Sequence, residues 1–114
     1  MMFKRAAEKL NRKSYKLMSA VYLLTAEVDL WHKVESYVIP NQIKFDDIQL
    51  KYCSGQGYTL FHAAKDLYLG TDHIKISDLA DTKVISTRVF GVICNAMAIR
   101  RFGVGAIHYK ETTK

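Results

Sequence analysis

The side chains of this sequence that could perform chemistry are four histidines, two cysteines and a few groups of acids. His62 and Asp66 stand four residues apart, a spacing that places both on one face of a helix. In that position the carboxylate could orient the imidazole as a general base. No nucleophile motif accompanies the pair, so we interpret it as a hydrogen-bonded surface pair rather than a catalytic one.

Two further patterns share residue types with known active sites but lack essential parts. Asp46 and Asp47 with Lys51 have the composition of a metal-dependent nuclease centre. Such a centre places an acid and a lysine close together on a strand, whereas Asp46 and Lys51 are five residues apart. Gly55-Gln-Gly57 lacks the further glycine, the lysine and the preceding apolar strand of a phosphate-binding loop. We expect ordinary loop residues at both places.

The histidines and the cysteines do not have the spacing of a metal site. The four histidines fall in different predicted elements, and none pairs with a cysteine at metal-ligand spacing: His32, His62, His73 and His108. Cys53 and Cys94 are too few for a disulfide framework, which favours a reduced intracellular chain. Whether the two thiols form a redox pair depends on a distance that the sequence does not show. We therefore expect no catalytic residue, no metal and no cofactor.

Positive charge is concentrated at the N-terminus. The chain of 114 residues has 17 Lys and Arg against 11 Asp and Glu, a net charge of +6. Six of the basic residues and one acid, Glu8, lie in the first sixteen residues, a net +5, so the rest of the chain carries only +1. On a helix over residues 2–24, five basic side chains gather opposite the apolar face. These are the partner-binding residues that the sequence predicts: Arg5, Lys9, Arg12, Lys13 and Lys16.

The five basic residues admit more than one explanation. Like charges on one helical face repel one another, so the stability of the helix does not account for them. A solvated face that aids solubility would account for them, and so would an anionic partner: an acidic protein groove, nucleic-acid phosphates or a membrane surface. A membrane ranks lowest, because the opposite face mixes Ala and Ser with larger residues, which is typical of packing against a core.

Length and composition predict one domain with one core over residues 1–114, at 49% apolar content. Within it, residues 1–16 form the basic helical segment, and residues 110–114 form a polar tail that we expect to fray. No apolar run approaches the length needed to cross a bilayer, and no signal peptide opens the chain. We therefore expect a cytoplasmic protein that does not bind membranes.

The apolar spacing predicts helices in the first half of the chain. The first covers residues 2–24, either unbroken or with a break near Asn11 or Ser14. A second runs from its N-cap Thr25 to Pro40, which ends it. Residues 43–50 have room for one short strand.

The second half of the chain predicts two long helices. One follows the cap at Ser54 and ends at Gly70, after which residues 73–77 could form a short strand and residues 78–84 a helical turn. The last helix, Thr87–Phe102, has Ser86 as its cap. Because apolar residues cover most of its circumference, we expect it in the middle of the core. Residues 76–81 before it are faintly similar to the first helix of a helix-turn-helix. In that motif the second helix binds the major groove of DNA, and a helix as apolar as Thr87–Phe102 would lose its core contacts there.

The predicted fold is therefore mainly α: a compact bundle of four to five helices around a central C-terminal helix, with at most two short strands. From residue 19 to residue 103 the sequence also resembles a family of short proteins from Gram-positive bacteria and their phages, a domain of unknown function. Four segments carry the resemblance: Ala20–Thr25, Asp29–Val34, Ala63–Gly70 and Asn95–Gly103. Lys65 and Asp66 depart from the family pattern, which has an aromatic residue and an Asn there, and residues 1–16 are not part of it. The resemblance implies a helical fold and a phage or prophage protein in the cytoplasm of a bacterial host, and it brings no known activity and no catalytic residues.

These features predict a non-catalytic protein that acts by protein–protein contact with a host or phage macromolecule. In its sharpest form the protein is an anti-CRISPR-like inhibitor of a bacterial defence nuclease complex, with the basic residues imitating or blocking a nucleic-acid contact. That form rests on the setting that the resemblance implies. The alternative is sequence-tolerant nucleic-acid binding through the same basic residues. A structural or assembly protein remains open if the charges serve only to solvate the surface.

Overall fold

Helix α2 (Tyr15–Leu24) is the element around which the rest of the chain packs in the computed structural model, which describes residues 2–107. After Lys16 the helix carries no charge, and its next residues are buried on every side: Leu17, Met18, Ser19, Ala20, Val21, Leu23 and Leu24. The small residues Ser19 and Ala20 let neighbouring helices approach closely. The helix begins at Ser14, whose hydroxyl accepts a hydrogen bond from the Leu17 N–H at 3.4 Å.

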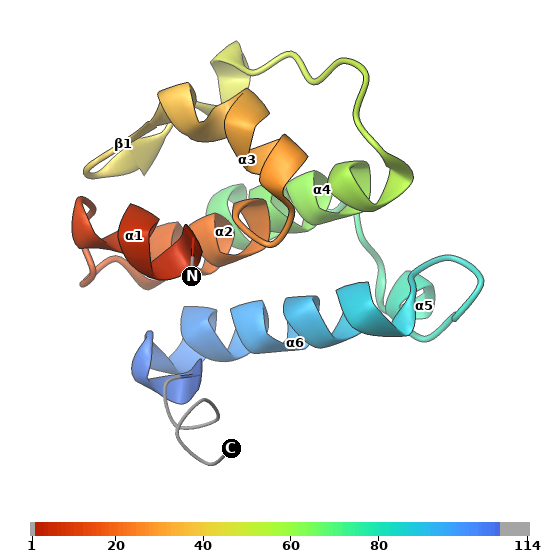
Figure 1. Ribbon diagram of the computed structural model, residues 1–114. Helices are drawn as coiled ribbons and strands as arrows, with labels where there is room; N and C mark the ends of the chain where they lie inside the picture. The colour runs from red at the N-terminus through yellow and green to blue at the C-terminus, as the bar shows by residue number, and fades with distance from the viewer. Residues whose placement is uncertain (1, 108–114) are drawn as a thin grey trace.

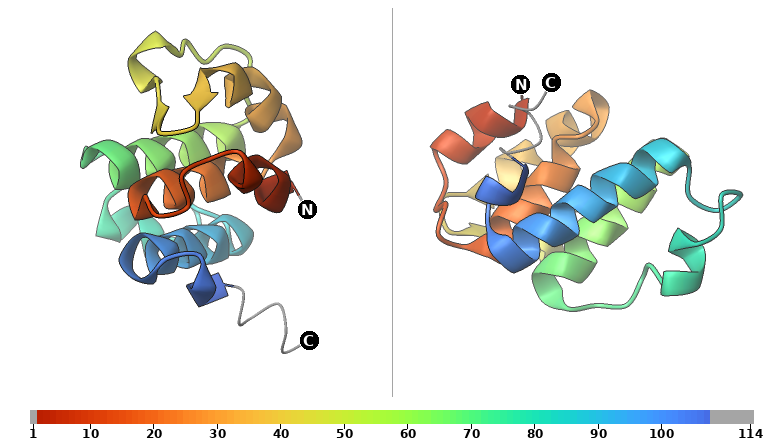
Figure 2. Two further views of the ribbon diagram at one scale, coloured as in Figure 1. Left: turned by 90° about the vertical axis from the view of Figure 1, so that its left-hand side faces the viewer. Right: turned by 90° about the horizontal axis from the view of Figure 1, so that it is seen from below.

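The other long helices lie on different sides of α2. Its largest contacts are with α4 (Gly55–Leu69) and α6 (Thr87–Phe102), and it also touches α1 (Met2–Glu8) and α3 (Val28–Val34). Figure 1 shows the resulting layers, with α3 above, α2 and α4 in the middle and α6 below. Figure 2 shows the same order from the side, with α6 along the opposite face of the molecule from α3.

The shorter elements connect these helices. A 3-10 turn, η1 (Glu35–Tyr37), continues α3 into a hairpin of β1 (Val38–Ile39) and β2 (Gln42–Ile43). The two strands are antiparallel, with Val38 opposite Ile43 and Ile39 opposite Gln42. A second 3-10 turn, η2 (Phe45–Asp47), follows, and α5 (Ile76–Leu79) is a single turn before α6.

The mainly helical fold with two short strands is confirmed over the described residues, and so are several predicted caps. Ser54 accepts a hydrogen bond from the Gly57 N–H, and Ser86 accepts one from the Val89 N–H. Gly70 ends α4 in the left-handed conformation, with φ of 78°. These boundaries were predictable because each depends on a hydrogen bond or a backbone angle within a few residues.

The predicted position of the last helix is wrong, because α2 rather than α6 occupies the centre. In α6 one stripe, which includes Val89 and Ile93, is buried against α2 and α4. The side chains of Phe90 and Phe102 are 41% and 65% exposed. The apolar content of α6 did not make it the central helix, because the same helix carries three arginines that must reach water. The better indicator of the centre was the uncharged run of α2.

The helix predicted over residues 2–24 is broken between Glu8 and Tyr15, which was one of the two alternatives. Two other local predictions need correction. Thr25 does not start the second helix but ends α2, with its hydroxyl donating to the Val21 carbonyl at 2.8 Å, and Glu27 is the N-cap of α3. Residues 73–77 contain no strand, because Asp66 holds that segment in a loop. The predicted tail at residues 110–114 and His108 lie outside the described residues.

Candidate binding surface at the basic end

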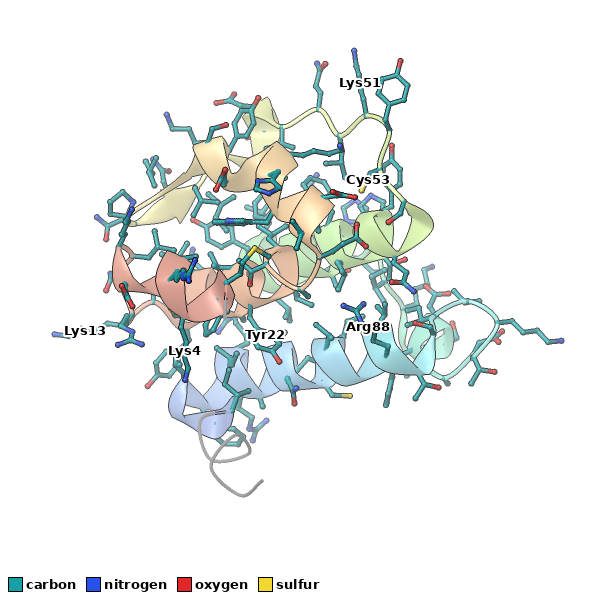
Figure 3. All side chains as sticks on the ribbon, viewed as in Figure 1. Lys4, Lys13, Tyr22, Lys51, Cys53 and Arg88 are labelled. Carbon is teal, nitrogen blue, oxygen red and sulfur yellow. The ribbon has the colours of Figure 1, made fainter. Side chains whose placement is uncertain are left out.

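The basic segment forms a helical hairpin whose turn lies at one end of the molecule. Arg5 lies in α1 and Lys16 in α2, while Lys9, Arg12 and Lys13 occupy the connection between the two helices. Figure 3 shows Lys13 extending away from the body of the protein at this end. The five predicted residues therefore do not form a stripe on one helix, but four of them remain together on the outside of α1 and its turn.

Hydrogen bonds hold the turn in place. The Asn11 N–H donates to the Pro40 carbonyl at 2.7 Å, which joins the turn to the tip of the β1–β2 hairpin. The Asn11 side chain accepts a hydrogen bond from the Lys13 N–H at 3.1 Å. The Ser14 N–H donates to the Asn11 carbonyl at 3.1 Å. The cations of the turn are therefore mounted on a backbone with fixed geometry.

The charges on this surface are not neutralised within residues 2–107. Arg5, Lys9, Arg12 and Lys13 are exposed, and none forms an ion pair with an acid in that part of the chain. Lys16 differs, because its ammonium lies 5.0 Å from the centre of the Tyr68 ring, in a cation–π contact. We therefore define the basic surface as Arg5, Lys9, Arg12 and Lys13 and treat Lys16 as partly structural.

A hollow of about 430 Å³ lies beside the basic surface. Two of the basic residues, Arg5 and Lys9, contribute to its lining, together with a large apolar surface that includes Trp31. His32 and Glu35 are also part of the lining, and the Nδ1 atom of His32 lies 3.7 Å from a Glu35 carboxylate oxygen. The full lining consists of Met2, Arg5, Ala6, Lys9, Leu10, Trp31, His32, Glu35 and Val38.

This arrangement can bind an apolar side chain flanked by acids. The apolar lining would remove such a side chain from water, while Arg5 and Lys9 would attract carboxylates beside it. Glu35 lies in the same hollow and would repel any anion placed inside it, so the hollow suits an uncharged side chain while the acids of the partner lie outside it. The chemistry of the hollow thus differs from that of a purely cationic surface.

The predicted His62–Asp66 pair is replaced by a different contact. The Nδ1 atom of His73 lies 2.9 Å from the Asp66 carboxylate, and the His62 ring stacks on the His73 ring with 4.8 Å between centroids. Asp66 also accepts hydrogen bonds from the Thr71 hydroxyl at 2.6 Å and from the Ile74 N–H at 2.7 Å. Asp66 therefore clamps the loop that follows α4.

The pKa values of this cluster reflect that role. Burial alone would raise the pKa of Asp66, but hydrogen bonds from Thr71 and from the backbone of His73 and Ile74 outweigh it, so the pKa is lowered. Burial lowers the pKa of His62, and the neighbouring His73 and Lys65 lower it further. The cluster therefore favours a charged Asp66 and a neutral His62 at neutral pH.

The N-terminus of α4 is closed to a phosphate by its own neighbours. The Ser54 hydroxyl donates to a Glu27 carboxylate oxygen at 3.1 Å, which brings an acid to the start of the helix. A Cβ added at Gly57 would collide with Cys53 Sγ and come within 3.1 Å of Glu27. Burial, and then the Glu27 carboxylate, raises the pKa of the Cys53 thiol. Gly57 is thus explained by close packing rather than by a ligand.

The structure also shows where the residues of the other predicted motifs lie. Asp46 and Asp47 lie in η2 and line a hollow of about 410 Å³ with Tyr68. Figure 3 shows Lys51 extending from the loop at the top of the molecule. Cys53 and Cys94 are both free thiols. Among the described residues no group of three or more metal-ligating side chains could hold an ion.

Sequence reasoning missed the hollow, because Trp31 and Val38 come from α3 and the hairpin, far along the chain from α1. The signal in the sequence was Trp31 itself, a large aromatic residue within the helix predicted to end at Pro40. No described helix has the length and apolarity that a membrane span requires. Comparison of the chain with family models, curated proteins and solved structures finds no match.

Proposed function

We propose that this protein is a non-catalytic binding protein whose basic surface docks on an acidic patch of another protein. One observation carries the proposal: cations without acidic partners in residues 2–107 stand beside a hollow whose lining includes the indole of Trp31. A solubilising surface needs the charges but has no use for the hollow. A docking surface uses both, because an apolar anchor contributes affinity and the surrounding charges speed association.

The charge distribution favours a protein over nucleic acid as the partner. Outside the first sixteen residues the chain carries a net charge of only +1. A duplex contacts proteins mainly through its phosphates and needs a broad positive surface. Sequence-tolerant nucleic-acid binding through Arg12 and Lys13 is the alternative outcome of the test below.

The narrower form of the proposal is that the partner is a host or phage protein and that docking inhibits a bacterial defence nuclease complex, in an anti-CRISPR-like manner. The phage setting comes from the resemblance of residues 19–103 and not from the geometry. Nuclease effectors carry acidic catalytic centres and basic nucleic-acid channels, and a cationic protein could reach the former. Loss of inhibition in a variant without the basic surface would support this form.

The experiment compares the wild type with a variant in which Arg5, Lys9, Arg12 and Lys13 are all changed to Gln. All four side chains are exposed, so the variant should keep its thermal stability. A matched control changes four exposed lysines elsewhere to Gln: Lys33, Lys44, Lys51 and Lys75. Tagged proteins are incubated with bacterial lysate, with and without added nuclease.

We expect the wild type and the control to retain a protein partner after nuclease digestion, and the basic-surface variant to lose it. With about 0.2–1 kcal/mol for each exposed charge contact, loss of four contacts would weaken binding by about 0.8–4 kcal/mol, which reduces the affinity about 4- to 1,000-fold. Retention that disappears on nuclease digestion would show that nucleic acid is the partner. Equal retention by the wild type and the basic-surface variant would contradict the proposal.

A further inference from the structure

The outer face of α6 carries an apolar stripe with the spacing of a helix–helix interface. Phe90, Cys94 and Met97 follow one another at intervals of four and three residues, the spacing of neighbouring interface positions in a coiled coil. Thr87 and Arg101 extend the stripe by one position at each end. The side chain of Phe90 is 41% exposed and that of Met97 is 40% exposed.

No described element covers this face. The buried stripe of α6 faces α2 and α4, and the view from below in Figure 2 looks onto the outer side of α6 with no other described helix in front of it. A Cβ added at Gly91, beside the stripe, would meet nothing within 4 Å. Apolar residues in such a repeat are unusual on a solvated helix.

We propose that a second copy of this chain covers the stripe, in an antiparallel dimer whose two-fold axis passes near Cys94. Cys94 stands at the middle of the stripe, because Thr87 and Arg101 are each seven positions away, while Phe90 and Met97 are four and three positions away. A two-fold axis at Cys94 therefore brings Phe90 of one copy beside Met97 of the other. An isologous contact needs a self-complementary surface of this kind.

Charge complementarity selects the antiparallel direction. The C-terminal end of the stripe carries Arg101, whereas residues 76–86 before the helix carry Asp78, Asp81 and one lysine, a net −1. Arg100 does not contribute to this face, because its Nε donates to the Leu67 carbonyl of α4 at 3.1 Å. Antiparallel pairing places each positive end beside a negative end, and it also opposes the two helix dipoles. Parallel pairing would place the two Arg101 side chains side by side.

The contact area predicts a weak dimer. A helix of 16 residues is about 24 Å long, so one helix face buries less than the about 800 Å² per partner of a standard interface. The groove of about 590 Å³ between α5 and the start of α6, which Phe90 helps to line, adjoins the stripe and adds apolar area. We therefore expect a dissociation constant of about 10–100 µM.

Cross-linking tests the position of the axis. A Cys53→Ser variant leaves Cys94 as the one thiol of the chain, and a short bis-maleimide is added at about 100 µM protein, within the expected range of association. We expect a covalent dimer of two Cys94 thiols, and a large reduction of cross-linking in a further Met97→Glu variant. Absence of a covalent dimer while Cys94 reacts with a monofunctional maleimide would overturn the two-fold axis at Cys94.

Sedimentation equilibrium tests the dimer without chemistry. From about 10 to about 500 µM, the wild-type mass should rise toward twice 13.1 kDa, whereas Met97→Glu should stay monomeric with an unchanged melting temperature. Val28→Glu is the control, because Val28 is 54% exposed on α3, in the layer opposite α6, and the change adds the same charge. A wild type that stays monomeric throughout, or equal association of Met97→Glu and wild type, would overturn the proposal.

Discussion

At the scale of single residues, Asp66 has the largest number of described contacts among the acidic side chains. Its carboxylate accepts hydrogen bonds from the Thr71 hydroxyl and from the backbone N–H groups of His73 and Ile74, and it also pairs with the His73 ring. These contacts fix the chain where it leaves α4 and turns toward α5. The sequence placed Asp66 on the polar face of a helix but gave no sign of its partners, because they come from the following loop.

Asp66→Asn should destabilise the protein by about 1–2 kcal/mol at pH 7, since the amide keeps one acceptor oxygen and loses the charge that strengthens these hydrogen bonds. The folded-state pKa of Asp66 is lowered, so its contribution is fully present above the unfolded-state pKa of about 3.9 and is lost as pH falls through the folded value. Urea unfolding should therefore show a difference between wild type and variant that shrinks below about pH 4.

The control for that experiment is Asp72→Asn, which removes an exposed acid from the same loop. Its effect at pH 7 should stay within about 0.5 kcal/mol. If Asp66→Asn lowered the stability equally at pH 7 and at pH 3, the loss would not come from the ionised carboxylate.

The close approach of Gly103 to Tyr15 is a second feature at the scale of single residues. Its φ is +92°, and an added Cβ would lie 2.9 Å from the Tyr15 ring. Gly103→Ala should therefore cost about 3 kcal/mol, from backbone strain and collision together. Gly70→Ala is the matched control, because Gly70 also has a positive φ, of 78°, but meets nothing within 4 Å, so its cost should be about 1 kcal/mol. Equal losses in thermal melts would mean that Tyr15 moves aside freely.

At the scale of elements, the starts of helices could be predicted from nearby residues, whereas the arrangement of the elements could not. Ser54 and Ser86 gave the starts of α4 and α6 because an N-cap acts within three residues. The hairpin and the central helix depend on contacts between distant segments. The hydrogen bond from Asn11 to Pro40 illustrates this dependence, since it joins two segments that the sequence treats as unrelated.

Because α2 rather than α6 is the central helix, shortening a side chain should cost more stability in α2 than in α6. Leu24 of α2 is fully buried, so Leu24→Ala should cost about 3 kcal/mol through lost apolar contacts and a cavity. Phe90 of α6 is 41% exposed, so Phe90→Ala should cost about 1 kcal/mol or less in dilute solution. Chemical unfolding at low micromolar concentration measures both. Similar losses at the two positions would show that α6 is as buried as α2.

At the scale of the whole molecule, charge and apolar surface are separated. The basic surface and its hollow lie at the α1 turn and beside α3, while the apolar stripe lies on the outer side of α6. The sequence predicted the exposure of the basic residues from their position opposite an apolar face. The sequence could not show the hollow beside them, because its walls come from α1, α3, η1 and β1.

The separation allows both surfaces to be occupied at once, so removal of one should leave the other intact. A Met97→Glu variant should bind the acidic partner as the wild type does at concentrations where both are monomeric. Isothermal titration with that partner would check this. Weaker binding by Met97→Glu would mean that docking requires the dimer.

Site-specific photo-cross-linking tests the central claim, that the basic surface contacts an acidic protein, most directly. A photo-reactive amino acid replaces Arg12 in one protein and Lys51 in a second; both positions are exposed, and Figure 3 shows Lys51 on a different part of the molecule from the turn. After irradiation in bacterial lysate and nuclease digestion, we predict a discrete protein adduct from position 12 that is absent from position 51. Adducts at position 12 that consist only of nucleic acid, or identical adducts at both positions, would contradict the claim.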